Sequence, residues 1–591
     1  MNTALEKRLK RQVIGKPHRF LAVIPLGFEQ TFVNELEYIR GERRDERREA
    51  TIAEQPRIVG DGKVEFTAKI TEAWKIVAYS RIANRVLMHI ADFKAENFRE
   101  FEKKASEVPW ELYLDDKCEN RESRPSELGH DRDQHLVLEQ RESTKTSNSI
   151  VIHVTCKHSR LYHSDAIAER LQKVIEDTPA LKPIVQKQEP RHARPDRASI
   201  DSRLSPSSED KRKNDEQFSQ HLYVNFLDDR CTIWLDLAGE ELYKRGFERF
   251  VNDAPLKETI AAAMLFEAIH LAKPQEILRL RATPSTQDDT AVDPIGASRL
   301  QDDRNKNLQH NNNDNVTLEQ RDRVHEKTSL DSSITNLRFS TQDDRSAKPQ
   351  SECNERPHTS HPITLIDPMS GSGTFSLEAA CIANNIIPDV CRDFALKHQP
   401  AFKEATWKHI LGNRFQVTGF TIFTSDISER SIEIIKHNVE CSPLANITPS
   451  PVNPQLKDFF SYTAQEIANI STHASTSPCD SDKTSVSQSG CIPILVLNPP
   501  YGKRLDFNAP KLYTKIGKKL AELAHDLKTF NKSLTVAILA PKDDTRTGSK
   551  YTCTANLLRE CPTLAPNKNS TAKLIETSHG GFSLNVFIAR I

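Results

Sequence analysis

The N-terminal part of the chain alternates between strand-like and helix-like patterns of hydrophobic residues. The apolar run 18–25 predicts a strand, and Phe28, Phe32 and Leu36 then recur at the spacing of one helix face. The same patterns predict a strand over 62–66, a helix over 70–84 and a strand over 85–90. This order is typical of a small α+β domain, which we place at residues 1–92.

Similar patterns continue between residues 93 and 250. Residues 149–154 are expected to form a strand, and Asp165 is placed to cap a helix over 166–175. Two apolar runs, 222–226 and 231–237, flank the pair Asp228-Asp229, which predicts a hairpin. These elements indicate a second domain over 93–250.

Four polar stretches interrupt these patterns and are poor in large apolar residues. Such segments bury too little apolar surface to offset the entropy of ordering, so we expect disordered insertions. They span 119–147, 184–218, 281–358 and 471–490.

The remainder, 251–591, begins with a helix near Pro255 and then alternates strands with helices from residue 363 onward. This order predicts an α/β domain in which helices cover both faces of a parallel sheet. Two last strands, 573–576 and 583–588, predict an antiparallel hairpin. Ligands of such sheets bind at the carboxyl ends of the strands, so the residues at those ends are the candidates for chemistry.

Composition limits the possible settings of the protein. Lys and Arg together number 82, as do Asp and Glu, so net charge does not indicate a nucleic-acid partner. The 11 cysteines include no C-x-x-C pair and no metal-like spacing, which favours a reducing cytoplasm and predicts no metal site. Residues 1–19 are basic but lack the apolar core of a secretory signal, and no apolar run is long enough to span a membrane. We therefore expect a soluble cytoplasmic protein.

A glycine-rich turn follows the first strand of the C-terminal domain. The strand ends at Asp367, and Gly371 and Gly373 precede a helix-like run. Glycines let the backbone approach a ligand closely, and the strand–turn–helix context is the one that a nucleotide-type cofactor requires. Asp426 ends the next strand, where its carboxylate could accept hydrogen bonds from ribose hydroxyls. From the residues alone, Asp426 is equally well interpreted as a helix N-cap, with Ser428 as its competitor.

The tetrapeptide Asn498-Pro499-Pro500-Tyr501 follows an apolar strand-like run, 492–497. The Asn side-chain oxygen and the Pro499 carbonyl can both accept hydrogen bonds from one amino group. The prolines fix the backbone, because their φ angles are held near −65°, and the aromatic ring can stack on a planar base. A Pro-Pro pair after a strand is often only a stiff loop, but this combination suits an exocyclic amino group that attacks an electrophile.

The two motifs together resemble a known family. DPMSGSGT at 367–374 and LNPPYGKRL at 497–505 resemble two motifs of class I S-adenosylmethionine-dependent methyltransferases. Their combination resembles the RlmL-like bacterial large-subunit ribosomal RNA guanine-N2 methyltransferases, which carry a THUMP domain; that family usually has Cys where this chain has Ser370. The resemblance implies a ferredoxin-like domain and a THUMP domain before a Rossmann-like methyltransferase sheet. It also implies S-adenosylmethionine as the cofactor, bound by these residues: Asp367, Gly371, Gly373, Asp426 and Asp458.

Asp458 enters this set because the resemblance places an acid there, near the adenine amino group; a surface turn is the alternative. Basic residues in two segments, 157–163 and 242–247, resemble the THUMP segment and its end. A basic cluster alone is usually a solvated face. The resemblance implies instead phosphate contacts on folded RNA, made by Lys157, Arg160, Lys244 and Arg245.

The resemblance implies methylation of the N2 amino group of a guanine in 23S ribosomal RNA, either free or within an assembling large subunit, by a monomer. The guanine would be flipped out of its helix, held by Asn498 and the prolines, and stacked on Tyr501. Alternative substrates that share the tetrapeptide are guanine N2 in tRNA, adenine N6 in DNA and a protein glutamine amide. A non-catalytic RNA-binding assembly factor is the alternative from a different class.

Overall fold

The computed structural model describes residues 3–41, 55–114, 149–178, 181, 219–251, 255–272, 363–388, 392–412, 420–473, 493–500, 509–543 and 553–591. All of them belong to one compact unit, Met1–Thr283 with Thr359–Ile591. The four predicted polar insertions lie outside the described residues, with one exception. Residues 471–473 complete helix α10 (Ala464–His473), so the fourth insertion was predicted to begin too early.

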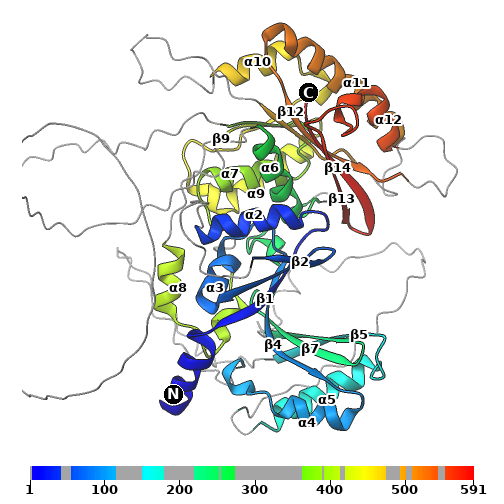
Figure 1. Ribbon diagram of the computed structural model, residues 1–591. Helices are drawn as coiled ribbons and strands as arrows, with labels where there is room; N and C mark the ends of the chain where they lie inside the picture. The colour runs from blue at the N-terminus through cyan, green and yellow to red at the C-terminus, as the bar shows by residue number, and fades with distance from the viewer. Residues whose placement is uncertain are drawn as a thin grey trace, which may run out of the picture. The chain divides into compact units, whose positions relative to one another are not determined.

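The N-terminal half contains a seven-stranded sheet in the order β2-β3-β1-β4-β7-β6-β5 (Figure 1). Strand β4 pairs with β1 on one side and with β7 on the other, so the two domains predicted at 1–92 and 93–250 contribute strands to one sheet. The predicted hairpin is confirmed: β6 and β7 are antiparallel, and Asp228 and Asp229 have the positive φ angles, 50° and 61°, of a tight turn. The strands are β1 (Pro17–Val23), β2 (Arg57–Gly60), β3 (Lys63–Lys69), β4 (Arg85–Lys94), β5 (Ser149–Lys157), β6 (Ser219–Leu227) and β7 (Arg230–Asp236).

Two helix ends in this half differ from the prediction. The helix expected over 70–84 stops at Tyr79, because Ser80 turns to an extended conformation and donates its hydroxyl to Glu35 at 2.7 Å. The N-cap of α5 is His163 and not Asp165. Asp165 lies in the first turn, where its carboxylate interacts favourably with the helix dipole. The helices are α1 (Thr3–Leu9), continued by Lys10–Ile14, α2 (Glu29–Arg40), α3 (Ile70–Tyr79), α4 (Phe98–Ser106) and α5 (Ser164–Glu176).

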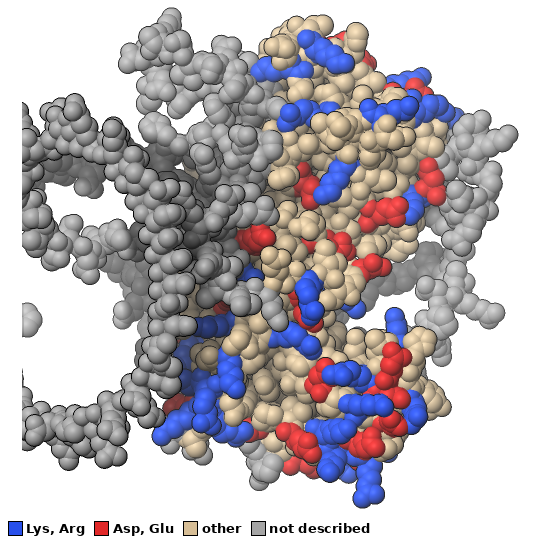
Figure 2. Space-filling view, viewed as in Figure 1, with Lys and Arg blue, Asp and Glu red and all other residues tan. Residues whose placement is uncertain are grey.

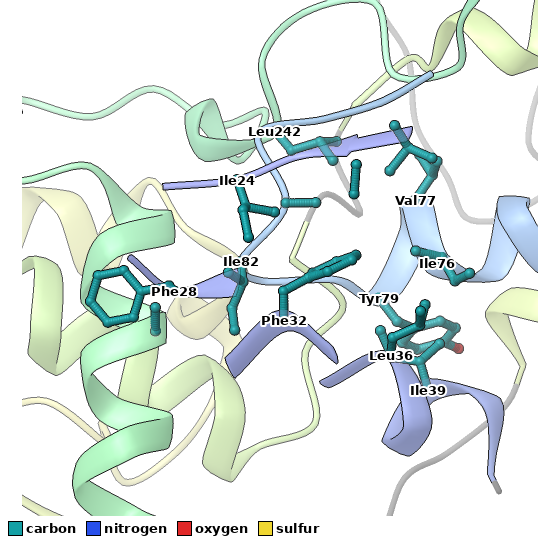
Figure 3. Close-up of a cluster of buried hydrophobic side chains, with 14 of the residues drawn as sticks. Ile24, Phe28, Phe32, Leu36, Ile39, Ile76, Val77, Tyr79, Ile82 and Leu242 are labelled. Carbon is teal, nitrogen blue, oxygen red and sulfur yellow. The ribbon is translucent and has the colours of Figure 1, made fainter. Parts of the chain in front are cut away.

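Helices α2 and α3 contribute to a hydrophobic core that extends into the C-terminal half. Phe28, Phe32 and Leu36 belong to the same buried cluster as Ile76 and Val77 of α3 (Figure 3). Residues of α6 (Glu258–Ala272) belong to the same buried cluster. Hydrogen bonds reinforce this contact, since Thr31 donates to Glu267 at 2.5 Å and the Tyr79 hydroxyl donates to the carbonyl of Ile410 at 2.8 Å. The N-terminal half is therefore packed directly on the C-terminal half.

The C-terminal half contains the predicted α/β sheet, in the order β10-β9-β8-β11-β12-β14-β13. The first five strands of this order run parallel, and β14 is antiparallel to β12. Strands β13 and β14 pair antiparallel, which confirms the closing hairpin. The strands are β8 (Ile363–Asp367), β9 (Phe420–Asp426), β10 (Pro454–Leu456), β11 (Ile494–Leu497), β12 (Thr535–Pro541), β13 (Lys573–His579) and β14 (Phe582–Arg590).

Helices bury both faces of this sheet. Ile494 and Val496 join the cluster that contains α6 and α7, whereas Leu495 and Leu497 join the cluster of α10 and α11. Two buried faces explain why the strand is an unbroken apolar run rather than an alternation. The helices are α7 (Thr374–Ala383), α8 (Glu404–Leu411), α9 (Glu429–Glu440), α10, α11 (Ala509–Leu527) and α12 (Cys553–Glu560). Within the described residues, no helix is long and apolar enough to cross a membrane.

Candidate functional site

A cavity of about 680 Å³ lies at the carboxyl ends of strands β8 to β11. It brings together residues that are far apart in the sequence, because parallel strands end at the same edge of a sheet. Six of the predicted site residues line it, namely Gly371, Asp426, Asp458, Asn498, Pro499 and Pro500.

The glycine loop, residues 370–373, forms one wall of the cavity. Ser370 anchors it by donating both its backbone N–H (3.1 Å) and its hydroxyl (2.8 Å) to the carbonyl of Ser425. Gly371 and Gly373 have φ angles of 56° and 79°, which side-chain-bearing residues rarely adopt. A Cβ at Gly373 would also meet the Ile435 side chain at 3.0 Å. Both glycines are therefore required by the loop itself, and Gly373 starts α7 without lining the cavity.

Asp426 connects the glycine loop to the start of α9. Its two carboxylate oxygens accept hydrogen bonds from the backbone N–H groups of Gly371 (2.8 Å) and Ser428 (3.0 Å). Ser428 is the N-cap of α9 and accepts from Ser431, which decides between the two predicted caps. Asp426 is thus free of a capping role and lines the cavity, where a carboxylate suits ribose hydroxyls.

Asp458 lies just beyond the end of β10, in a turn that borders the cavity. Its side chain accepts a hydrogen bond from the Phe460 N–H (3.0 Å) at the start of a short turn, and the same residue lines the cavity. Ile427 lies on the lining next to Asp426 and is 72% exposed. The exposed apolar side chain of Ile427 lies on the same cavity wall as the acids Asp426 and Asp458. Such a wall suits a ligand with a flat ring that carries hydrogen-bond donors.

Asp367 does not line the cavity, so the prediction that it contacts the cofactor directly is wrong. The residue is fully buried, and its Oδ2 accepts a hydrogen bond from the Ser376 hydroxyl (2.7 Å), which in turn accepts from Thr424 (2.7 Å). Burial raises the pKa of Asp367 to about 7, partly opposed by the Ser376 hydrogen bonds. Asp367 therefore links the end of β8 to α7 and, through Ser376, to β9.

This raised pKa predicts a pH dependence of stability. The folded-state pKa of about 7 lies above the unfolded value, so the unfolded chain releases the proton first and stability falls as pH rises from about 4 to about 7. Asp367→Asn keeps the acceptor for Ser376 but has no proton to release. We expect its unfolding free energy, measured with urea across that interval, to fall less steeply than that of the wild type. Parallel curves for the two proteins would contradict the assignment.

Asn498 follows the last residue of β11 and is one of the residues that line the cavity. Its side-chain Oδ1 is buried and accepts no hydrogen bond within the described part of the chain. Pro499 is buried and Pro500 exposed, and both line the cavity. Tyr501 lies outside the described residues. A buried acceptor without a donor is costly, so a donor from a ligand would be favoured at this position.

Pro255 and Leu256, just before α6, also line the cavity and were missed in the sequence. The His579 ring is 2.7 Å from the carbonyl of Pro255. The only sequence signal was their place before a predicted helix, which gives no indication of where the chain passes in space.

The residues predicted to contact RNA have different environments. Lys157 is exposed at the end of β5. Arg160 and Lys244 are also accessible, but they form ion pairs with Glu96 and Glu240. Over the region where Figure 1 places α4 and α5, Lys and Arg are interspersed with Asp and Glu (Figure 2). This surface is mixed in charge rather than basic.

Arg245 is buried, so its predicted role in RNA contact is wrong. The residue is 2% exposed, and its guanidinium donates to both carboxylate oxygens of Glu378 on α7, at 2.9 and 3.2 Å. It also donates to the carbonyls of Leu242 (3.1 Å) and Arg81 (2.8 Å). Burial alone would raise the pKa of Glu378, but Arg245 and Arg81 hold that pKa below its usual range. Arg245 therefore joins the two halves of the protein.

Comparison with known proteins agrees with this geometry. The family model described as RMKL-like, methyltransferase domain, matches residues 359–448, which include the glycine loop and Asp426. This part of the chain is therefore similar to the methyltransferase domain of RMKL-like proteins. The predicted resemblance of the chain to RlmL-like methyltransferases is confirmed.

Two curated relatives match this chain over only a small part of their own length. Ribosomal RNA large subunit methyltransferase K/L of Syntrophotalea carbinolica is 25% identical over 252 residues, which cover 43% of this chain and 26% of the relative. The protein of the same name from Psychromonas ingrahamii is 24% identical over 213 residues, which cover 35% and 20% of the two chains. The matched part is thus a fifth to about a quarter of the length of these relatives.

Solved structures share the fold across nearly the whole chain. A possible methylase from Clostridium difficile 630 has a TM-score of 0.52 at 15% identity and covers 97% of this chain and 98% of its own. SMU.472, a candidate methyltransferase solved in complex with SAH, has a TM-score of 0.51 at 16% identity, with 97% and 98% covered. The predicted class I methyltransferase fold is confirmed.

S-adenosylmethionine is the cofactor of this RMKL-like domain. The residues of the cavity fit it: the glycine loop allows close approach, Asp426 suits the ribose, and Asp458 with Ile427 suits the adenine. Within the described residues, no group of three or more His, Cys, Asp or Glu side chains could hold a metal ion.

Proposed function

We propose that the protein transfers a methyl group from S-adenosylmethionine to the exocyclic N2 of a guanine in 23S ribosomal RNA. The observation that carries this proposal is the buried Oδ1 of Asn498, which has no hydrogen-bond partner within the described residues, in a residue that lines the same cavity as Gly371 and Asp426. An acceptor at this point selects a substrate that brings an N–H donor.

Bound S-adenosylmethionine supplies an electrophilic methyl group on a sulfonium. Asn498 Oδ1 and the Pro499 carbonyl would each accept one N–H of the guanine amino group. These two bonds orient the nitrogen lone pair, which is otherwise delocalised into the ring, and orientation supplies much of the acceleration in such transfers. The nitrogen gains the methyl group and loses one proton, which leaves to solvent. Tyr501 is proposed to stack on the flipped base.

The choice of RNA rests on the N-terminal half and on the relatives. The strands and helices over 93–250 are proposed to form a THUMP-like module, with Lys157, Arg160 and Lys244 near the RNA backbone. Curated relatives carry the name ribosomal RNA large subunit methyltransferase. Free 23S RNA and an assembling large subunit are both compatible with this proposal, as are a monomer and a cytoplasmic location.

The test is mass spectrometry of RNA from a strain that lacks the gene, combined with transfer of labelled methyl groups by the purified full-length protein. We expect one N2-methylguanosine to disappear from 23S RNA and to be restored in vitro. An unchanged 23S RNA with a changed tRNA would support the tRNA alternative. A protein that binds no labelled S-adenosylmethionine would support the assembly factor.

A further inference from the structure

A short strap, residues 249–251, crosses from the N-terminal half to the glycine loop. The side chain of Asn438, fully buried on α9, accepts from the Phe250 N–H (2.8 Å) and donates to the Phe250 carbonyl (2.9 Å). The same amide donates to the carbonyl of Ser372 in the glycine loop (3.0 Å). Arg249 donates to Thr374 Oγ1 (3.2 Å). The strap backbone is therefore fixed beside the cofactor loop.

The side chain of Phe250 points away from these anchors and is 48% exposed. Its ring lies on the ring of His437, with centroids 4.0 Å apart and planes inclined by 8°. The backbone anchors and the stacking on His437 together restrict where this ring lies. Such preorganisation lowers the ordering cost of any ligand that stacks on it.

The stacked pair lies in a hollow of about 610 Å³ that is separate from the cofactor cavity. Val251 and Ile434 give it apolar walls. Its charged lining residues are two cations, Arg249 and Arg430, and one anion, Glu433. Arg249 is already paired with Glu258, whereas Arg430 is exposed and forms no ion pair with another described residue. An accessible aromatic ring beside an accessible arginine suits a ligand that combines a flat uncharged ring with an anionic group. A nucleotide, with its base and its phosphate, is such a ligand.

We propose that Phe250 and His437 form a stacking site for an unpaired base of the RNA, with Arg430 facing its phosphate. This inference rests on the proposed function, because it requires RNA as the partner. Aromatic rings stack on every base, so the site adds affinity with little sequence preference, and purines stack more strongly because their rings are larger. The base held here is a different one from the guanine in the cofactor cavity, since the two hollows share no lining residue.

The test compares Phe250→Ala with the wild type in the full-length protein. Binding of fluorescein-labelled oligoadenylate and oligouridylate 12-mers is followed by anisotropy. We expect Phe250→Ala to weaken oligoadenylate binding by about 5-fold to 100-fold, the loss of one stacked base, and to remove any preference for adenine. Phe250→Trp should restore both. Arg430→Ala should instead reduce the salt dependence of binding by about one phosphate contact.

Two controls distinguish the loss of a stacking contact from a general disruption of the structure. Phe530→Ala removes a ring that is 36% exposed on a different part of the surface, and it should leave RNA binding unchanged. Affinity for S-adenosylmethionine, measured by calorimetry, should be the same in Phe250→Ala and in the wild type.

The outcomes distinguish this inference from the proposed function. If the wild type methylates 23S RNA and Phe250→Ala binds RNA equally well, the stacking site is wrong and the function stands. Equal losses in Phe250→Ala and Phe250→Trp would also overturn it, because they would indicate a distorted strap. If the wild type neither binds nor methylates RNA, both proposals fail.

Discussion

Asn498→Ala is expected to reduce methyl transfer by about 100-fold or more in a single-turnover assay, while the protein still binds S-adenosylmethionine. The change removes the buried oxygen that has no partner within the described residues. Loss of one preorganised hydrogen-bonding group at a reacting centre typically has an effect of this size. The glycine loop, Asp426 and Asp458 are untouched, so cofactor affinity, measured by calorimetry, should not change.

Two further variants sharpen this result. Asn498→Asp keeps an acceptor oxygen at the same place and should retain more transfer activity than Asn498→Ala. Asn453→Ala removes an exposed asparagine outside the cavity and should behave as the wild type. Transfer near the wild-type rate in Asn498→Ala would show that the amino group is oriented by other groups.

The parts of the site that could be predicted share one physical rule. Gly371, Asp426, Asp458 and Asn498 each lie at or just after the end of a parallel strand, and the carboxyl ends of such strands meet at one edge of the sheet. Recognising the strands was therefore enough to bring these residues together. The same rule explains the error at Asp367, because a residue at a strand end can be buried against a neighbouring helix instead of lining the cavity.

Other features depend on contacts that no local pattern encodes. Arg245 lies in a basic run, yet its partner Glu378 is 133 residues away in the sequence. Pro255 and Leu256 reach the cavity because the chain passes beside the glycine loop before α6 begins. The shift of the α5 cap from Asp165 to His163 is smaller but has a similar origin, because cap positions depend on how the preceding loop enters the helix.

The burial of Arg245 leads to the second large effect. We expect Arg245→Ala to lower the free energy of unfolding by about 3–5 kcal/mol, because it leaves the buried Glu378 without its bidentate partner. The carbonyls of Leu242 and Arg81 also lose their shared donor. Urea unfolding followed by circular dichroism measures the difference. The neighbouring Lys244→Ala is the matched control: its pair with Glu240 is exposed, so we expect a change of at most about 1 kcal/mol.

A double variant tests whether the cost arises from an unpaired charge. Arg245→Met combined with Glu378→Leu removes both charges and should be less destabilised than the sum of the two single variants. Recovery should be incomplete, because Arg81 also donates to Glu378, at 3.3 Å, and would lose that partner. The opposite outcome has a definite meaning. If Arg245→Ala unfolds like the wild type and binds 23S RNA more weakly, Arg245 is accessible in solution, and its predicted contact with RNA phosphate regains its basis.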